Sequence, residues 1–285
     1  MQGGAVRKIQ VDSSLGRWTQ HEWRPAHLAG VVDFLWLFEG RLTCLRERTF
    51  PTGKLELIVH FGETYRLVEG VGPERCSVSC LTGLQTAPIV IEAPDGPSCV
   101  MGVRLHPAGA YAVLARPLSE VTGLTADLQD VLGQAAAELT ERCSEAPSAE
   151  ERLRRAVAWV EERVARFPAA DPAIVWIASQ IERRSGAVSI SALRERTGLT
   201  RTRLATAFRE QIGATPKLYA RILRFRRLLE LLAQGAGSLA ELAVTAGYYD
   251  QPHMNAEFRE LSGLTPREFL AADRYLNSVS IAEVA

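Results

Sequence analysis

The chain has 285 residues, a length that suits two ordinary domains. Its 47% hydrophobic and 23% charged residues can bury a core, and this composition excludes a disordered chain. No apolar run approaches the roughly 18 residues needed to span a bilayer, and residues 1–10 lack the apolar stretch of a signal peptide. We therefore expect a cytoplasmic protein with no membrane partner.

The charge is distributed unevenly, although 33 basic and 33 acidic residues cancel over the whole chain. Residues 186–230 hold ten basic residues against three acidic ones, a net charge of +7. Residues 1–185 and residues 231–270 each carry a net charge of −3. A basic block in an otherwise neutral chain favours one anion-binding surface.

The pattern of hydrophobic residues divides the chain in two. Residues 27–107 alternate short β-rich runs with turn residues, which is an all-β pattern. Residues 126–166 predict two helices, and FPAADP then predicts a linker because its two prolines bracket small residues. The expected fold class is α+β. We expect a β-rich domain with a helical extension, a linker, an all-α module and a tail, at residues 1–167, 168–171, 172–272 and 273–285.

The all-α module contains an internal repeat. SISALRERTGLTRTRLATAFREQIGATPKLY, from Ser189, aligns with SLAELAVTAGYYDQPHMNAEFRELSGLTPREF, from Ser238. Each copy predicts a serine-capped helix that stops at a glycine, followed by a second helix capped by Thr200 or Asp250. Helix, glycine turn and capped helix is the helix-turn-helix plan.

The segment between the copies, TPKLYARILRFRRLLELLAQ, predicts one long helix because no breaker follows its opening proline. At about 1.5 Å per residue it spans roughly 27 to 30 Å, close to the roughly 34 Å pitch of B-DNA. We expect the two units to enter successive major grooves and to read unlike sequences.

These residues resemble the AraC/XylS family of transcription regulators over residues 172–271. The most specific segments are GATPKLYARILRFRRLLELL and AELAVTAGYYDQPHMNAEFRELSGLTPREFL. The resemblance implies seven helices with two helix-turn-helix units, usually fused to an N-terminal sensing or dimerising domain. The N-terminal half is similar to the cupin-like regulatory domains of that family through VVDFLWLFEG, KLELIVHFG, TGLQT and MGVRLHPAG.

The resemblance implies a sequence-specific regulator of transcription that binds double-stranded DNA and does no covalent chemistry. RNA polymerase, a small-molecule effector in the N-terminal domain and a homodimer are further expected partners, and activation is favoured over repression. Two alternatives remain open: a cupin-like metal-dependent enzyme with an accessory helical module, and a constitutive DNA binder whose N-terminal half only dimerises.

Carried onto this sequence, the recognition helices are Thr200 to Ile212 and Asp250 to Leu261. Family members often have arginine where Thr206 and Ala256 stand, so Arg201 and Arg203 are expected to contact phosphate or guanine instead. Gln251 is suited to an adenine edge. An alternative for the arginines between the repeats is a solvated helix face. The candidate DNA-binding residues are Arg201, Thr202, Arg203, Thr206, Arg221, Arg224, Gln251, Pro252, His253 and Asn255.

The N-terminal half offers no catalytic motif, and we expect no cofactor and no metal. His60 and His106 are isolated in the sequence, and a cupin metal centre needs clustered histidines. Buried thiols are favoured over a zinc site for Cys44, Cys76, Cys80 and Cys99. The apolar stripe of residues 153–164 predicts either a dimerisation helix or packing on its own domain. Two outcomes are open for three tryptophans, a ligand pocket or the core: Trp18, Trp23 and Trp36.

Overall fold

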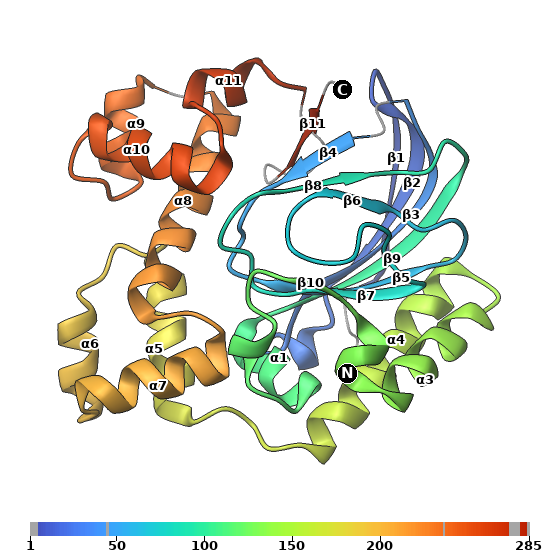
Figure 1. Ribbon diagram of the computed structural model, residues 1–285, viewed down its shortest axis with the longest axis horizontal. Coiled ribbons are helices and arrows are strands. Elements are labelled where there is room, and N and C mark those ends of the chain that lie inside the picture. The colour runs from blue at the N-terminus through green and yellow to red at the C-terminus, as the bar shows by residue number, and fades with distance from the viewer. Residues whose placement is uncertain (1–4, 44–45, 236, 274–279, 284–285) are drawn as a thin grey trace.

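A computed structural model describes residues 5–43, 46–235, 237–273 and 280–283, and it confirms the α+β class. A β-rich domain and an all-α module lie side by side (Figure 1). Cys44, which we considered as a zinc ligand, lies outside the described residues, as does the start of the chain at residues 1–4.

Two antiparallel sheets form the β-rich domain. The larger sheet has the order β1 (Arg7–Ser13), β2 (Gly16–Trp23), β3 (Val32–Leu42), β9 (Ser98–Leu105), β5 (Leu55–His60), β7 (Ser79–Thr82) and β10 (Thr125–Asp127). The smaller sheet has the order β11 (Ser280–Glu283), β4 (Arg46–Thr49), β8 (Ile89–Glu92) and β6 (Arg66–Glu69). Gly102 in β9 allows the indole ring of Trp36 to lie against the strand, since a Cβ atom there would overlap that ring.

Helices cover one side of the larger sheet (Figure 1). They are α1 (Pro107–Leu114), α2 (Leu128–Leu132), α3 (Gln134–Ser144) and α4 (Ala149–Arg166), with short 3-10 turns η1 (Ala26–Leu28) and η2 (Leu118–Glu120). The two helices predicted for residues 126–166 are α3 and α4, preceded by a short strand and the single-turn α2. The apolar stripe of α4 is buried against α1, α3 and the sheet, so it is not a free dimerisation surface.

The all-α module contains α5 (Pro172–Arg183), α6 (Ile190–Thr197), α7 (Arg201–Ile212), α8 (Pro216–Gln234), α9 (Leu239–Thr245), α10 (Gln251–Ser262) and α11 (Pro266–Ala271). Side chains of Ser189, Thr200, Ser238 and Asp250 cap α6, α7, α9 and α10 as expected. The 19 residues of α8 form the predicted connecting helix, about 28 Å long at 1.5 Å per residue.

The end of the chain differs from the expected tail. Residues 280–283 form β11, which pairs antiparallel with β4 so that Ile281 lies opposite Arg48. Ile281 is buried. This strand could not be predicted from the sequence, because it is four residues long and its partner lies some 230 positions away in the printed sequence.

The two parts of the chain share one continuous hydrophobic core. The ring of Phe50, just after β4, meets Phe225 of α8 and Phe269 of α11 edge to face, with centroids 6.3 and 5.8 Å apart. At the other end of the module, the Thr122 hydroxyl donates to the carbonyl of Gly213, where α7 ends (2.6 Å). The β-rich domain therefore contacts both helix-turn-helix units.

Candidate nucleic-acid interface and ligand cavity

The first recognition helix, α7, presents four predicted DNA-binding residues to solvent. Thr200 caps the helix by accepting a hydrogen bond from the backbone N–H of Arg203 (3.2 Å). Leu204 and Phe208 are buried, which fixes the opposite side of the helix in the core. The exposed residues of its early turns are Arg201, Thr202, Arg203 and Thr206.

The second recognition helix, α10, is arranged in the same way. Asp250 accepts a hydrogen bond from the backbone N–H of His253 (2.8 Å), and Met254 and Phe258 are buried. Gln251 is half-buried, and the exposed predicted residues are Pro252, His253 and Asn255. Because the Asp250 carboxylate already occupies the start of α10, the side chains rather than the helix N-terminus are available to DNA.

Arg221 and Arg224 lie inside the module. Both guanidinium groups are half-buried and pair with Glu257 of α10, at 2.9 and 3.2 Å, and Arg221 also pairs with Glu260 (2.5 Å). Arg224 additionally lies over the ring of Tyr248. The structure therefore gives these two candidate DNA-binding residues a structural role, that of holding α10 against α8.

One exposed residue of the second unit, Tyr249, was not among the DNA-binding residues predicted from the sequence. Tyr249, in the turn before α10, is 89% exposed, whereas its neighbour Tyr248 is buried. A large aromatic side chain so exposed beside a recognition helix is suited to contact a nucleic-acid backbone or base. The signal in the sequence was the YYD triplet, in which only one tyrosine can face the core.

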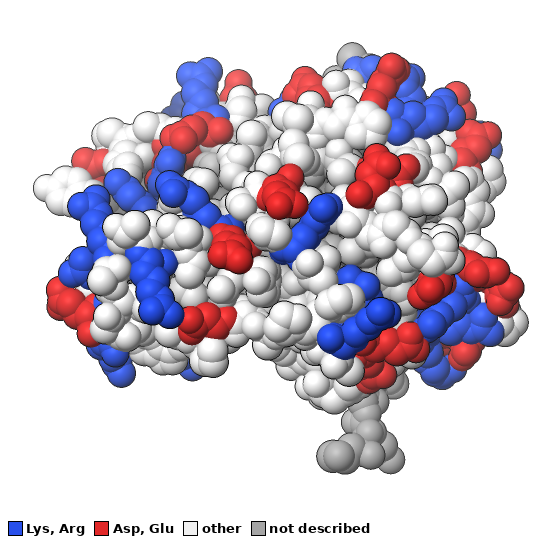
Figure 2. Space-filling model, turned by 60° about the horizontal axis from the view of Figure 1, so that its bottom comes forward, with Lys and Arg blue, Asp and Glu red and all other residues white. Residues whose placement is uncertain are grey.

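Basic side chains gather over the helical module, at the left of Figure 2. Of the two helix-turn-helix units, the first carries more of them. Helices α6 and α7 hold Arg194, Arg196, Arg201, Arg203 and Arg209, whereas α9 and α10 hold Arg259 alone. Arg196 lies over the ring of Trp176, which holds its guanidinium group near α5. The surface around the first unit is therefore the more attractive one for a polyanion.

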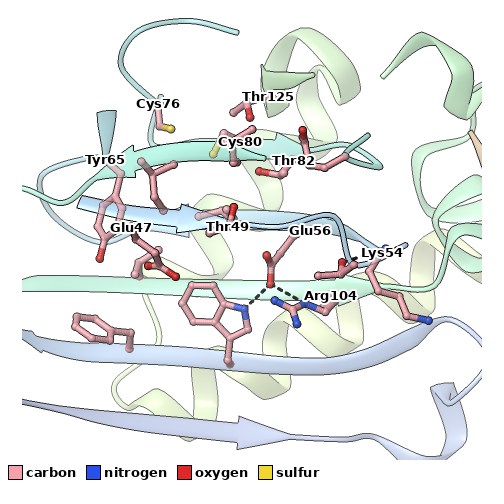
Figure 3. A pocket seen from close by; sticks show the side chains of 18 of the residues that line it. Glu47, Thr49, Lys54, Glu56, Tyr65, Cys76, Cys80, Thr82, Arg104 and Thr125 are labelled. Carbon is pink, nitrogen blue, oxygen red and sulfur yellow. Dashed lines mark hydrogen bonds and ion pairs between the residues drawn. The ribbon is translucent and has the colours of Figure 1, made fainter. Parts of the chain in front are cut away.

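A cavity of about 230 Å³ lies between the two sheets of the β-rich domain. Trp18 and Trp36 line it, and Trp18 also belongs to a buried hydrophobic cluster, whereas Trp23 does not line the cavity. The Nε1 atom of Trp36 donates to Glu56 (2.6 Å), and Arg104 donates to the same carboxylate oxygen (3.3 Å), as Figure 3 shows. The other aromatic residues of the wall are Phe34, Phe38, Phe50 and Tyr65.

Two polar atoms in the lining of this cavity have no hydrogen-bond partner among the described residues. They are the Nδ1 atom of His60 and the hydroxyl oxygen of Thr125, and both are buried. Burial lowers the pKa of His60, which favours the neutral ring. Because an unpaired buried polar atom is costly, these two atoms are positions where a bound molecule can form hydrogen bonds.

Lys54 connects the cavity to the helical module. Its side chain is only 4% exposed, and its Nζ atom lies 3.0 Å from Glu182 of α5 and 2.6 Å from Nδ1 of His106. Tyr219 of α8 donates to the same carboxylate (2.5 Å). Burial alone would raise the pKa of Glu182, but the hydrogen bond from His106 and the charge of Lys54 hold it well below its usual range.

Residues 193–272 match the family described as "Helix-turn-helix domain". These residues, and not the whole C-terminal module, form the helix-turn-helix domain, which is of the AraC/XylS type. Residues 22–127 match a second family, described as a domain of unknown function, DUF6597. Both recognition helices thus lie within the first match, and most of the residues that line the cavity lie within the second.

Two curated relatives resemble this chain. The HTH-type transcriptional activator RhaS of Escherichia fergusonii is 27% identical over 117 residues, which cover 41% of this chain and 35% of RhaS. The HTH-type transcriptional regulator ArgR of Pseudomonas aeruginosa is 29% identical over 70 residues, which cover 25% of this chain and 21% of ArgR. The chain thus spans about a third or less of the relatives it matches.

Among solved structures, ToxT of Vibrio cholerae is similar with 11% identity and a TM-score of 0.46, covering 83% of this chain and 97% of ToxT. The AraC-like transcriptional activator CuxR has 16% identity and a TM-score of 0.32, covering 81% of this chain and 87% of CuxR. Both TM-scores are below 0.5.

Within the part of the chain that the structure describes, no three His, Cys, Asp or Glu side chains are grouped so that they could hold a metal ion. His60 lies in the cavity wall and His106 beside Lys54. Over the same residues, no helix combines the length and the apolar character needed to cross a membrane.

Proposed function

We propose that this protein is a DNA-binding transcription regulator that reads duplex DNA with α7 and α10 and responds to a small molecule in the cavity of its β-rich domain. The observation that carries the proposal is the pair of capped recognition helices with exposed early turns at the two ends of α8 (Figure 1). We further propose a cytoplasmic location, contact with RNA polymerase and self-association.

The length of α8 supports two contacts on one face of the duplex. A rod of about 28 Å is close to the roughly 34 Å that separates successive major grooves. The exposed residues differ between the helices, with arginines and threonines on α7 and an amide, an imidazole and a proline on α10. Different side chains at the two ends favour an asymmetric binding site.

The cavity supports the response to a small molecule. It has aromatic walls, a few charged groups and two unpaired polar atoms, which is the usual character of a ligand pocket. Lys54 lines this cavity and also pairs with Glu182 of α5 in the all-α module. A ligand that changes the position of Lys54 therefore acts on the contact between the two parts of the chain.

Footprinting tests the DNA-binding proposal. Duplexes selected from random sequence by the unmodified protein would be probed with Thr202→Ala and His253→Ala proteins. Each variant should lose protection or base preference in a different patch, the two patches lying roughly 10 base pairs apart. Gln129→Ala, on exposed α2 of the β-rich domain, is the matched control and should leave the footprint unchanged. Loss of the same patch by both variants would contradict reading by two helices.

A further inference from the structure

Two thiols face each other in the wall of the cavity. Cys76 is 6% exposed and Cys80 is 1% exposed, both line the cavity, and neither is in a disulfide. Figure 3 shows the two sulfur atoms directed toward one another. Nothing in the DNA-binding function uses this pair.

The fold holds both cysteines in place. Cys80 lies in β7, opposite Ile58 of β5 on one side and Asp127 of β10 on the other. Cys76 precedes the strand, and its backbone N–H donates to the carbonyl oxygen of Tyr65 (2.9 Å). The proximity of the thiols is thus set by strand pairing, and little chain entropy is lost when they are joined.

The environment gives the two thiols unequal acidity. The hydrogen bond with Cys80 lowers the pKa of Cys76 despite burial, and the same bond raises the pKa of Cys80. Burial raises the pKa of Cys99 to about 11 and that of Cys143 to about 12. Because the thiolate is the reactive form, Cys76 is the nucleophile among these four residues.

We propose that Cys76 and Cys80 are an oxidation-sensitive dithiol that closes to a disulfide in the cavity wall when it meets a peroxide. The Cys76 thiolate attacks one oxygen of hydrogen peroxide, the O–O bond breaks, and the departing hydroxide takes up a proton to become water. The resulting sulfenic acid is attacked by the Cys80 sulfur, which loses its proton as the S–S bond forms and a second water leaves. Both sulfur atoms are oxidised and the peroxide is reduced.

The position of Cys80 connects this reaction to the first helix-turn-helix unit. Its strand pairs with β10, and shortly before β10 Thr122 donates to the Gly213 carbonyl at the end of α7. A covalent bond between residues 76 and 80 fixes the strand that supports β10. Oxidation is therefore expected to change the cavity wall and, through β10, the contact between Thr122 and Gly213 that positions α7.

The test is differential alkylation of the reduced full-length protein, without DNA, before and after treatment with hydrogen peroxide. Tryptic peptides should show Cys76 and Cys80 losing reactivity together, with the loss of two hydrogen atoms from the peptide that begins at Cys76. Cys44 is found in a separate tryptic peptide. Cys99 shares the peptide with the pair and, like Cys143, should remain reduced at the peroxide concentration that oxidises half of the pair.

Single variants separate the roles of the two thiols. In Cys76→Ser, the Cys80 thiol should stay reduced; in Cys80→Ser, Cys76 should advance to sulfinic acid because no second thiol intercepts it. Cys143→Ser is the matched control and should oxidise as the unmodified protein does. Phenylarsine oxide, which bridges adjacent thiols, should bind the unmodified and Cys143→Ser proteins but neither single variant of the pair.

Thermal unfolding of each variant confirms that it is folded before the comparison is made. Oxidation of Cys76 with Cys99, or equal oxidation of all cysteines, would overturn the proposal. So would a pair that stays reduced and fails to bind the arsenical in the folded protein.

Discussion

Glu257 joins α10 to α8 through two arginines. Its carboxylate is 5% exposed and accepts hydrogen bonds from Arg221 and Arg224. A buried carboxylate shared by two guanidinium groups stabilises the fold mainly because its loss would leave the half-buried Arg224 without this ion pair and Arg221 with Glu260 alone. In the sequence, these two arginines are recognisable only as part of a basic cluster. Glu257 lies 33 to 36 positions away from them, too far for a helical spacing such as i to i+4 to predict the pairing.

Replacing Glu257 with Gln is expected to lower the free energy of unfolding by about 2 kcal/mol, below the roughly 3–5 kcal/mol for fully buried pairs because both arginines keep some solvent contact. Urea unfolding measures the loss. Glu260→Gln removes an exposed partner of Arg221 and should cost less than about 0.5 kcal/mol. Equal losses in the two variants would contradict the role given to Glu257.

The charge of Glu182 makes stability depend on pH in the acid range. Its pKa is lower in the folded protein than in the unfolded chain, so its contribution is complete above the unfolded pKa and is lost as the pH falls toward the folded one. The difference in unfolding free energy between the unmodified protein and Glu182→Gln should be largest near pH 7 and shrink below about pH 4. Urea titrations across this range would reveal a constant difference if the carboxylate were unimportant.

At the scale of elements, the repeat predicted where the helices begin and end far better than it predicted which elements they contact. The caps at Thr200 and Asp250 and the 19 residues of α8 follow from local chemistry, because caps and breakers act within a few residues. The contact between α7 and the β-rich domain depends on Thr122 and Gly213, which lie 91 residues apart. The cavity, too, is formed by strands brought together only by folding.

Two glycines show how closely the helices approach. Gly186 and Gly198 both have left-handed backbones, with φ of +79° and +68°. A Cβ atom at Gly186 would overlap the carbonyl oxygen of Ala220 in α8, whereas the space around Gly198 is open.

Gly198→Ala should lower the free energy of unfolding by about 1 kcal/mol, which is the strain of a non-glycine residue in the left-handed conformation. Gly186→Ala should lower it by roughly 1–3 kcal/mol more, because α8 must move away from the turn that follows α5. Chemical denaturation of the two variants measures both values. A loss at position 186 no greater than that at position 198 would show that the approach of α8 is looser than described.

At the scale of the molecule, the β-rich domain and the all-α module are joined by packing as well as by the chain between α4 and α5. Phe50 contributes its ring to the core of the helical module, between α8 and α11. The ion pair of Lys54 with Glu182 lies at the same boundary. We therefore expect the protein to unfold in one cooperative transition, although the sequence suggested two independent units.

Phe50→Ala should lower the free energy of unfolding by about 3 to 4 kcal/mol, because the ring fills space shared by the β-rich domain and the all-α module. We expect it also to separate the single calorimetric transition into two. Phe50→Leu retains most of the apolar volume and should lower the melting temperature less, with one transition preserved. Two transitions in the unmodified protein would contradict this account of the boundary.

The pairing of β11 with β4 bears on how the protein can be divided. The β-rich domain is discontinuous in sequence, since its smaller sheet is completed by residues 280–283 after the whole helical module. A fragment that stops near residue 167 would leave one side of β4 with unsatisfied backbone groups, a known origin of edge-to-edge aggregation. A synthetic peptide bearing residues 280–283 would restore the missing strand by β-augmentation, and a circularly permuted chain that begins with β11 would carry its own.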